Sequence, residues 1–199
     1  MKGKPIKGVI ALTKEFSGVA GEARIAAELV RNGFRVAKPY WNHDEIDLLL
    51  IDKSNDRLIP IPIQVKSIQF IPNKNQKLKD KNPIQGLRKK YVDNNFALCL
   101  AIYRPDLDNI WFINGNKNII RVYEEQQSWN KRHKKYESLK EEDDIRIYVP
   151  YDINSTNFLS DWLLSKDDPI PLRKRITEIK EEMTNYWDEV MKMSFFLDI

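Results

Sequence analysis

The sequence predicts an α/β fold in which a mixed β-sheet is flanked by helices. Helical periodicity appears first, three short strand-like runs follow it, and a helix start signal separates these runs from two further apolar strands. Hydrophobic residues make up 42% and charged residues 31% of the 199 positions, which is typical of a globular protein. The length suits one domain, with or without an appendage.

The first helix is predicted over Ser17–Asn32, with Ser17 as N-cap and Gly33 as terminator. Five apolar residues at helical spacing form one predicted core-facing stripe: Val19, Ala23, Ala26, Ala27 and Val30. Glu22 lies within that stripe. A carboxylate on a core-facing stripe needs a partner, so we expect Glu22 to bind a Lys, an Arg or a cation.

Three strands are predicted next, over residues 34–40, 45–51 and 58–67. The polar residues 52–57 favour a turn, so the last two strands form an antiparallel hairpin. With Ile51 placed opposite Leu58, Asp47 lies opposite Pro62. Pro62 lacks a ladder donor and should face an edge, a bulge or an unpaired side.

In this register Asp47 is diagonal to Gln64 and shares a face with Gln64 and Lys66, because strand side chains alternate between faces. A slip by one residue would place Asp47 on the other face. The prediction of a shared site therefore depends on the hairpin register.

Farther along, Asn82 and Pro83 predict a helix that runs to about Asn94. Apolar strands are predicted over 96–103 and 109–114, and a polar helix over 124–138. The remaining predicted elements are a strand around 145–149, a short helix over 156–165, and a last helix over 171–192. Six residues of that helix form an apolar stripe: Leu172, Ile176, Ile179, Met183, Tyr186 and Val190.

Charge divides the chain into a basic part, 1–136, and an acidic, largely helical extension, 137–199. The first part carries 25 basic and 14 acidic side chains, a net charge of +11, and the second carries 8 and 15, a net charge of −7. A polyanion would bind the basic part and repel the extension, which we expect to pack on the core or form an oligomer interface. The single cysteine, Cys99, lies in an apolar run and is predicted to be a buried, inert thiol. With no membrane span or signal-peptide core in the sequence, we expect a cytoplasmic protein.

A carboxylate, a neutral oxygen ligand and an ammonium in one pocket suit metal-assisted phosphodiester cleavage. Mg²⁺ takes oxygen ligands and retains waters, and Mn²⁺ is the alternative ion. Asp47 would be the principal ligand, assisted by the Gln64 side-chain carbonyl and the Val65 main-chain carbonyl. Glu22 would join directly or through water, and Lys66 would orient the nucleophile and stabilise developing negative charge.

This arrangement resembles the PD-(D/E)XK nuclease superfamily, which has a restriction-endonuclease-like fold. The likeness rests on Glu22 in Gly-Glu-Ala-Arg, Asp47 in Glu-Ile-Asp, and Gln64-Val-Lys66, in the element order αβββαβ over about residues 17–114. It implies a metal-dependent endonuclease. Gln64 replaces the usual acid of the motif, which removes one negative charge from the metal site.

The same resemblance suggests possible roles for Gln85 and Tyr91, although their spacing departs from the pattern seen in relatives. His43 is a further candidate for a phosphate contact, or else a structural histidine. Seven basic residues are predicted to grip DNA phosphates: Lys74, Lys77, Lys79, Lys81, Arg88, Lys89 and Lys90.

Structural alternatives remain for each site residue. Asp47 can be a strand-end carboxylate paired with a surface lysine, and Lys66 a solvated strand lysine. Glu22 can form a salt bridge with Arg35 or Lys38.

For the whole chain the leading interpretation is a Mg²⁺-dependent endonuclease acting on duplex or branched DNA. One chain supplies one site, so a homodimer is expected for double-strand or junction cutting. The alternatives are a non-catalytic DNA-binding or scaffold protein with a decayed site, and an RNA-directed nuclease.

Overall fold

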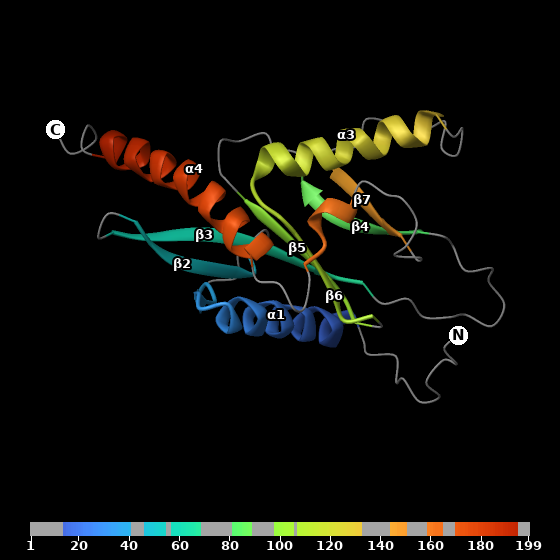
Figure 1. Cartoon of the computed structure of the whole chain (residues 1–199), viewed down its shortest axis with the longest axis horizontal. Helices are drawn as coiled ribbons and strands as arrows, with labels where there is room; N and C mark the ends of the chain where they lie inside the picture. Colours follow the sequence, from blue (N-terminus) through green and yellow to red (C-terminus); the bar gives the residue numbers. More distant parts are fainter. Residues whose placement is uncertain are drawn as a thin grey trace.

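The computed structural model describes residues 14–40, 46–54, 57–68, 81–88, 98–105, 107–132, 144–150, 159–164 and 170–194. A five-stranded sheet in the order β1-β2-β3-β5-β6 forms its centre (Figure 1). The strand bounds are Arg35–Ala37 for β1, Leu48–Ser54 for β2, Arg57–Ser67 for β3, Cys99–Arg104 for β5 and Asn109–Ile113 for β6. The sheet is mixed, because β3 pairs with β5 in parallel and the other neighbours are antiparallel. The predicted α/β class, with a mixed sheet flanked by helices, is confirmed.

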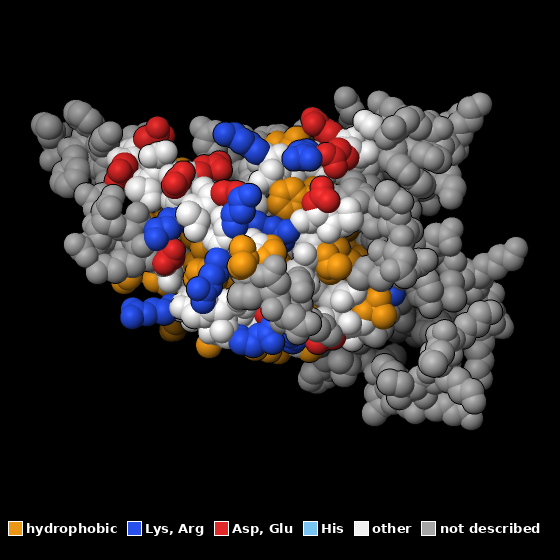
Figure 2. All heavy atoms as spheres, viewed as in Figure 1, with side chains coloured by type: hydrophobic (Ala, Val, Ile, Leu, Met, Phe, Trp, Pro, Cys, Tyr) orange, Lys and Arg blue, Asp and Glu red, His pale blue; other side chains and the backbone are white. Residues whose placement is uncertain are grey.

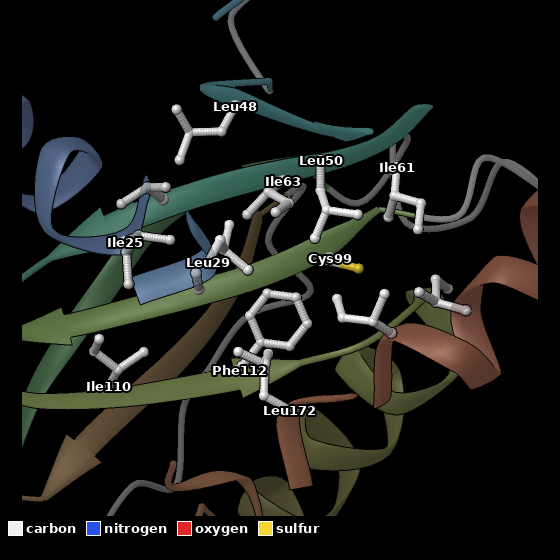
Figure 3. Close-up of a cluster of buried hydrophobic side chains, with 14 of the residues drawn as sticks. Ile25, Leu29, Leu48, Leu50, Ile61, Ile63, Cys99, Ile110, Phe112 and Leu172 are labelled. Carbon is white, nitrogen blue, oxygen red and sulfur yellow. The ribbon is translucent and has the colours of Figure 1, made fainter. Parts of the chain in front are cut away.

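Each face of this sheet has its own covering layer. Helices α1 (Lys14–Arg31) and α4 (Ile170–Ser194) pack on one face, where Ile25, Leu29 and Leu172 meet the strand residues Ile63 and Phe112 (Figure 3). On the other face, α3 (Asn116–Arg132) packs with a second sheet and the short 3-10 helix η1 (Ser160–Trp162). None of the helices in the described part of the chain combines the length and hydrophobicity that a bilayer crossing needs.

The second sheet corrects one prediction. Its two antiparallel strands are β4, Lys81–Arg88, and β7, Asp144–Pro150, so the helix predicted from Asn82 and Pro83 is wrong over residues 81–88. The asparagine-proline pair has the local signature of a helix start, but pairing with β7 across the chain overrides it. Proline is tolerated there because each strand of a two-stranded sheet has a free edge.

The first helix buries a different face from the one predicted. It begins at Lys14, so Ser17 lies within the helix and is not its N-cap. Val19 and Val30 are 61% and 57% exposed, and the residues that enter the core are Ile25 and Leu29. Of the other predicted stripe residues only Ala26 packs against the core; Ala23 and Ala27 are exposed.

Gly33 ends helix α1, as predicted, and its φ of +89° lies in the left-handed region that favours glycine.

The hairpin of β2 and β3 is confirmed, but its register differs from the predicted one by two residues. Ile51 pairs with Pro60 instead of Leu58, and Leu49, not Asp47, is opposite Pro62. The strands continue through the polar residues to the pair Ser54 and Arg57, and the Asp52 carboxylate pairs with Lys180 of α4 at 3.1 Å. A shift of two residues preserves the face of every paired side chain.

Both prolines of β3 lie where β3 has no partner on the side of β5. The pairing of β3 with β5 begins only at Ile63, so Pro60 and Pro62 remove no hydrogen bond from that ladder. The Pro60 carbonyl accepts a hydrogen bond from Trp187 Nε1 of α4 at 3.3 Å. The expectation that Pro62 faces an unpaired side is confirmed.

The remaining elements agree with the predictions to different extents. The predicted strands at 96–103, 109–114 and 145–149 and the last helix are present, and four stripe residues of that helix are buried: Leu172, Ile176, Ile179 and Met183. The polar helix α3 begins at Asn116, eight residues before the predicted start. Of the predicted short helix over 156–165, the described residues 159–164 contain η1. Cys99 is fully buried in the sheet, and burial raises the pKa of its thiol to about 12, which confirms an inert cysteine.

Candidate functional site

Asp47 lies in the bend just before β2 and is tied to β3 through main chain and side chain. Its amide donates to the Ile63 carbonyl at 3.0 Å. Its Oδ2 accepts two hydrogen bonds, from the Val65 amide at 2.6 Å and from Gln64 Nε2 at 2.8 Å. The carboxylate thus closes the open end of the hairpin and faces the Gln64 side chain directly, not diagonally as predicted.

The electrostatic environment of Asp47 places two further predicted residues nearby. Burial raises the pKa of Asp47 above its ordinary value, against the lowering effect of the hydrogen bonds from Val65 and Gln64. The Glu22 charge adds to the rise and the Lys66 charge opposes it. Glu22 and Lys66 therefore lie within electrostatic range of Asp47, and Gln64 contacts it directly.

Glu22 reaches the site from α1 and has a cationic partner. Lys38, which follows β1, donates from Nζ to Glu22 Oε2 at 2.6 Å, and this hydrogen bond raises the pKa of Lys38. Of the two salt-bridge partners named as alternatives, the structure has Lys38 and not Arg35 in this contact. The Glu22 side chain is 22% exposed and that of Lys38 is 66% exposed.

The close approach of α1 to the end of β3 depends on a glycine. A Cβ on Gly21 would meet the Ser67 Cβ at 2.8 Å, closer than real side chains come. The helix can therefore lie on β3 only because position 21 has no side chain. Because Glu22 is the next residue, this contact also positions Glu22 at the site.

At the opposite side of the same helix, an ion-pair network fixes α1 to the turn between β5 and β6. Arg24 donates to Asp108 and to Glu28, at 2.9 Å in each case. Arg31 donates to the other oxygen of Glu28 at 2.6 Å. These ion pairs hold α1 in position against the sheet.

The Gln64 side chain has one satisfied and one unsatisfied end. Gln64 is 2% exposed, its Nε2 is used by Asp47, and its Oε1 is buried with no hydrogen-bond partner. A buried amide oxygen without a partner is costly, and a cation or a donor would satisfy it.

The donor set fits a hard divalent cation. Asp47, Glu22 and the Gln64 oxygen are all oxygen ligands, and Mg²⁺ binds through one or two carboxylates with several waters retained. Among the described residues no group of three or more His, Cys, Asp or Glu side chains is placed to hold a metal. A cation here would accordingly have few protein ligands. The amide of Val65, whose carbonyl was a predicted ligand, already serves to hold Asp47.

Most of the predicted DNA-contacting residues lie outside the described residues. These are Lys74, Lys77, Lys79, Lys89 and Lys90, together with the possible site residues His43 and Tyr91. Lys81, Arg88 and Gln85 belong to β4, which is described by its backbone. Their roles stay predictions.

Two positions with a part in this geometry had no assigned role in the sequence analysis. Lys38 was named only as a structural partner of Glu22, and Gly21 was quoted only as a neighbour of Glu22. A glycine inside a helix costs about 1 kcal/mol relative to alanine, so its place beside a candidate acidic ligand is a usable signal of close packing.

Comparisons with known proteins find similarity among solved structures. No family model and no curated protein matches the chain. Among solved structures, the chain is similar to a bacterial homing endonuclease, I-Ssp6803I, with 14% identity and a TM-score of 0.43. The match covers 73% of this chain and 80% of the other. The function proposed below rests on the residues of the site.

Proposed function

We propose that this chain is a metal-dependent endonuclease of the PD-(D/E)XK type that hydrolyses phosphodiester bonds in duplex or branched DNA. The observation that carries the proposal is the meeting of Asp47 with Gln64 at one end of the hairpin, with Lys66 and Glu22 beside them. Carboxylate, amide oxygen and ammonium are the groups that phosphodiester hydrolysis needs around one phosphate.

Asp47, Glu22 and the Gln64 amide oxygen would hold Mg²⁺ or Mn²⁺. When bound, such an ion lowers the pKa of a coordinated water and offsets the charge of the phosphate. The unpartnered Oε1 of Gln64 supports this ligand set, because the buried oxygen gains a partner only when something binds. The hydrogen bonds from Val65 and Gln64 hold Asp47 Oδ2 in place.

Lys66 has the position of a group that handles the substrate. It lies two residues after Gln64 on β3, so both side chains leave the strand on the same face. An ammonium there can orient the attacking water and donate to a phosphate oxygen, which stabilises the negative charge that develops in the transition state.

The distribution of charge supports a nucleic-acid substrate. Residues 1–136 carry a net charge of +11, and phosphate contacts by lysine and arginine provide most of the affinity for a nucleic acid. Figure 2 shows acidic and basic side chains mixed over α3 and α4, and mainly basic ones on the side toward α1.

A homodimer is part of this proposal. Cutting both strands of a duplex, or two strands of a junction, takes two sites, and one chain provides one. The cleavage products of the dimer would be double-strand breaks at limiting enzyme concentration, whereas a monomer would give nicks.

A second candidate is a non-catalytic DNA-binding protein. The observation that favours it is the state of Asp47, whose Oδ2 is satisfied by two protein hydrogen bonds without any ion. In that case Asp47 acts as a strand-end cap, and the neutral Gln64 marks a site that no longer needs to attract a metal.

Cleavage of supercoiled plasmid in Mg²⁺ or Mn²⁺ separates these functions. We expect nicking or linearisation by the wild type and by Asp52→Asn, an acidic control on the same hairpin, and none by Asp47→Asn or Lys66→Met. Equal cleavage by all four proteins would refute the assignment of the site. DNA binding without cleavage in every protein would favour the non-catalytic function, and a parallel RNA substrate tests the choice of nucleic acid.

Gln64→Glu provides a test that does not depend on cleavage. Without metal, the new carboxylate replaces the amide that donates to Asp47, so the free energy of unfolding should fall. Mn²⁺ should restore it, because a third acidic ligand strengthens ion binding. A variant that is destabilised equally with and without Mn²⁺ would indicate a purely structural amide.

A further inference from the structure

Lys38 holds the place of a cation at the candidate site. Its Nζ lies 2.6 Å from Glu22 Oε2, a normal distance for a strong charge-assisted hydrogen bond. Its charge also acts on Asp47. The lysine therefore interacts with both carboxylates that the proposed function assigns to the metal.

Among the described residues of the site, the charges balance without any ion. Glu22 and Asp47 supply two negative charges, Lys38 and Lys66 supply two positive charges, and position 64 is a neutral amide. A dication entering this group of four side chains meets no net attraction from them unless one lysine moves away. Lys66 is partly buried on β3, whereas the Lys38 side chain is 66% exposed and follows the edge strand β1.

We propose that Lys38 is a resident counter-ion of Glu22 that a divalent cation must displace before Glu22 can serve the metal site. The inference rests on the proposed function, since it supposes that the site takes a metal. Glu22 Oε2 cannot contact an ammonium at 2.6 Å and a metal ion in the same place, and two cations on one carboxylate repel each other. The long, exposed lysine can leave into solvent at small cost.

This role sets how tightly the ion binds. An ordinary exposed ion pair adds at most about 1 kcal/mol to folding, so loss of Lys38 should change the free energy of unfolding little. A dication must displace this lysine from Glu22, so removal of Lys38 should raise the affinity for the ion by at most about fivefold, the factor that corresponds to about 1 kcal/mol. Lys38 is thus a positioning residue that sets the cation concentration at which the site assembles.

The test is Mn²⁺ binding to the full chain, measured by calorimetry or by the electron paramagnetic resonance of free Mn²⁺. We expect Lys38→Met to bind Mn²⁺ about three- to fivefold more tightly than the wild type. Lys38→Arg keeps the charge and should bind like the wild type. Lys174→Met, which removes the same charge from an exposed position on α4, should also leave the affinity unchanged.

The outcomes separate this inference from the function on which it rests. Loss of Mn²⁺ binding in Asp47→Asn together with equal binding by Lys38→Met and the wild type would overturn the role of Lys38 alone. Weaker binding by Lys38→Met would also overturn it, since the lysine would then be supporting Glu22 as a ligand. Absence of Mn²⁺ binding in the wild type, or equal binding by Asp47→Asn, would overturn both. Circular dichroism of each variant confirms that it is folded.

Discussion

The contact between Gly21 and Ser67 offers a direct test of how the site is assembled. Replacing Gly21 by Ala adds a Cβ that would lie 2.8 Å from the Ser67 Cβ and 3.3 Å from its Oγ. Ordinary contact begins at 3.4 Å, so α1 and β3 must separate by about 0.6 Å. The neighbour Glu22 moves with the helix, away from Asp47.

The expected change in stability is the difference between two effects. Overpacking a tight contact costs about 1–3 kcal/mol. Replacing a helical glycine by alanine returns about 1 kcal/mol. Gly21→Ala should therefore lower the free energy of unfolding by about 1 kcal/mol, and it should weaken Mn²⁺ binding, because the two carboxylates are no longer held at their native separation.

Gly18 provides the matched control on the same helix. A Cβ there would meet nothing within 4 Å, so Gly18→Ala should stabilise the protein by about 0.5–1 kcal/mol and leave metal binding unchanged. The two alanine variants should thus move urea midpoints in opposite directions.

A second substitution at Ser67 identifies the clashing atom. Because the nearest atom is the Ser67 Cβ, Ser67→Gly should relieve Gly21→Ala, and Ser67→Ala should not. A double-mutant cycle measures this coupling, which should be favourable for glycine and near zero for alanine. If Gly21→Ala is as stable as Gly18→Ala and binds Mn²⁺ normally, the close packing of α1 on β3 does not position the site.

Four further predictions follow from particular side chains. Burial raises the pKa of Asp47 above its ordinary value of 3.8. The protonated side chain therefore stabilises the fold below about pH 3.8, and this contribution is lost as the pH rises through the raised pKa. Urea unfolding between about pH 3 and 7 should show this loss in the wild type and not in Asp47→Asn. Lys66→Met should lower the cleavage rate about 10²–10³-fold without weakening Mn²⁺ binding, measured on the same samples. Arg175 donates to main-chain carbonyls of β6 and of η1 and stacks on an indole, so Arg175→Met should cost about 2–4 kcal/mol in urea unfolding and leave Mn²⁺ affinity unchanged. The Cys99 thiol should not react with Ellman's reagent in the native protein and should react once it is unfolded.

The sequence was informative where local pattern and packing agree. The strands around residues 48–67 alternate regularly, so the hairpin and the meeting of Asp47 with Gln64 could be predicted even though the turn is four residues shorter than expected and the register differs by two. The register error had no consequence for the paired faces, because side chains alternate with a period of two. Asp52, in the extended part of β2, pairs with Lys180, more than a hundred residues away, and no local pattern contains this contact.

The predictions were wrong where the local sequence does not distinguish between two faces of a helix, or between a local helix and a strand paired with a distant segment. Helix α1 carries small apolar residues around most of its circumference, so its sequence does not indicate which side is buried. The larger Ile25 and Leu29 enter the core, while Val19 and Val30 stay exposed. Residues 81–88 have a helix start signal, but β7 contributes the buried Ile147 and Val149, and strand pairing with it is favoured over a local helix.

The C-terminal helix α4, whose five basic and five acidic residues balance, supports the hairpin on which the candidate site is built. Helix α4 holds the turn end of the β2–β3 hairpin, through Lys180 to Asp52 and through Trp187 to the Pro60 carbonyl. Helix α1 packs against the other end, where Gly21 meets β3. A hairpin fixed at both ends keeps the carboxylate of Asp47 against β3 although its charge is partly desolvated. The anchor lies at the end of the hairpin remote from Asp47, so α4 stabilises the hairpin at its turn and leaves the end that carries Asp47 to α1.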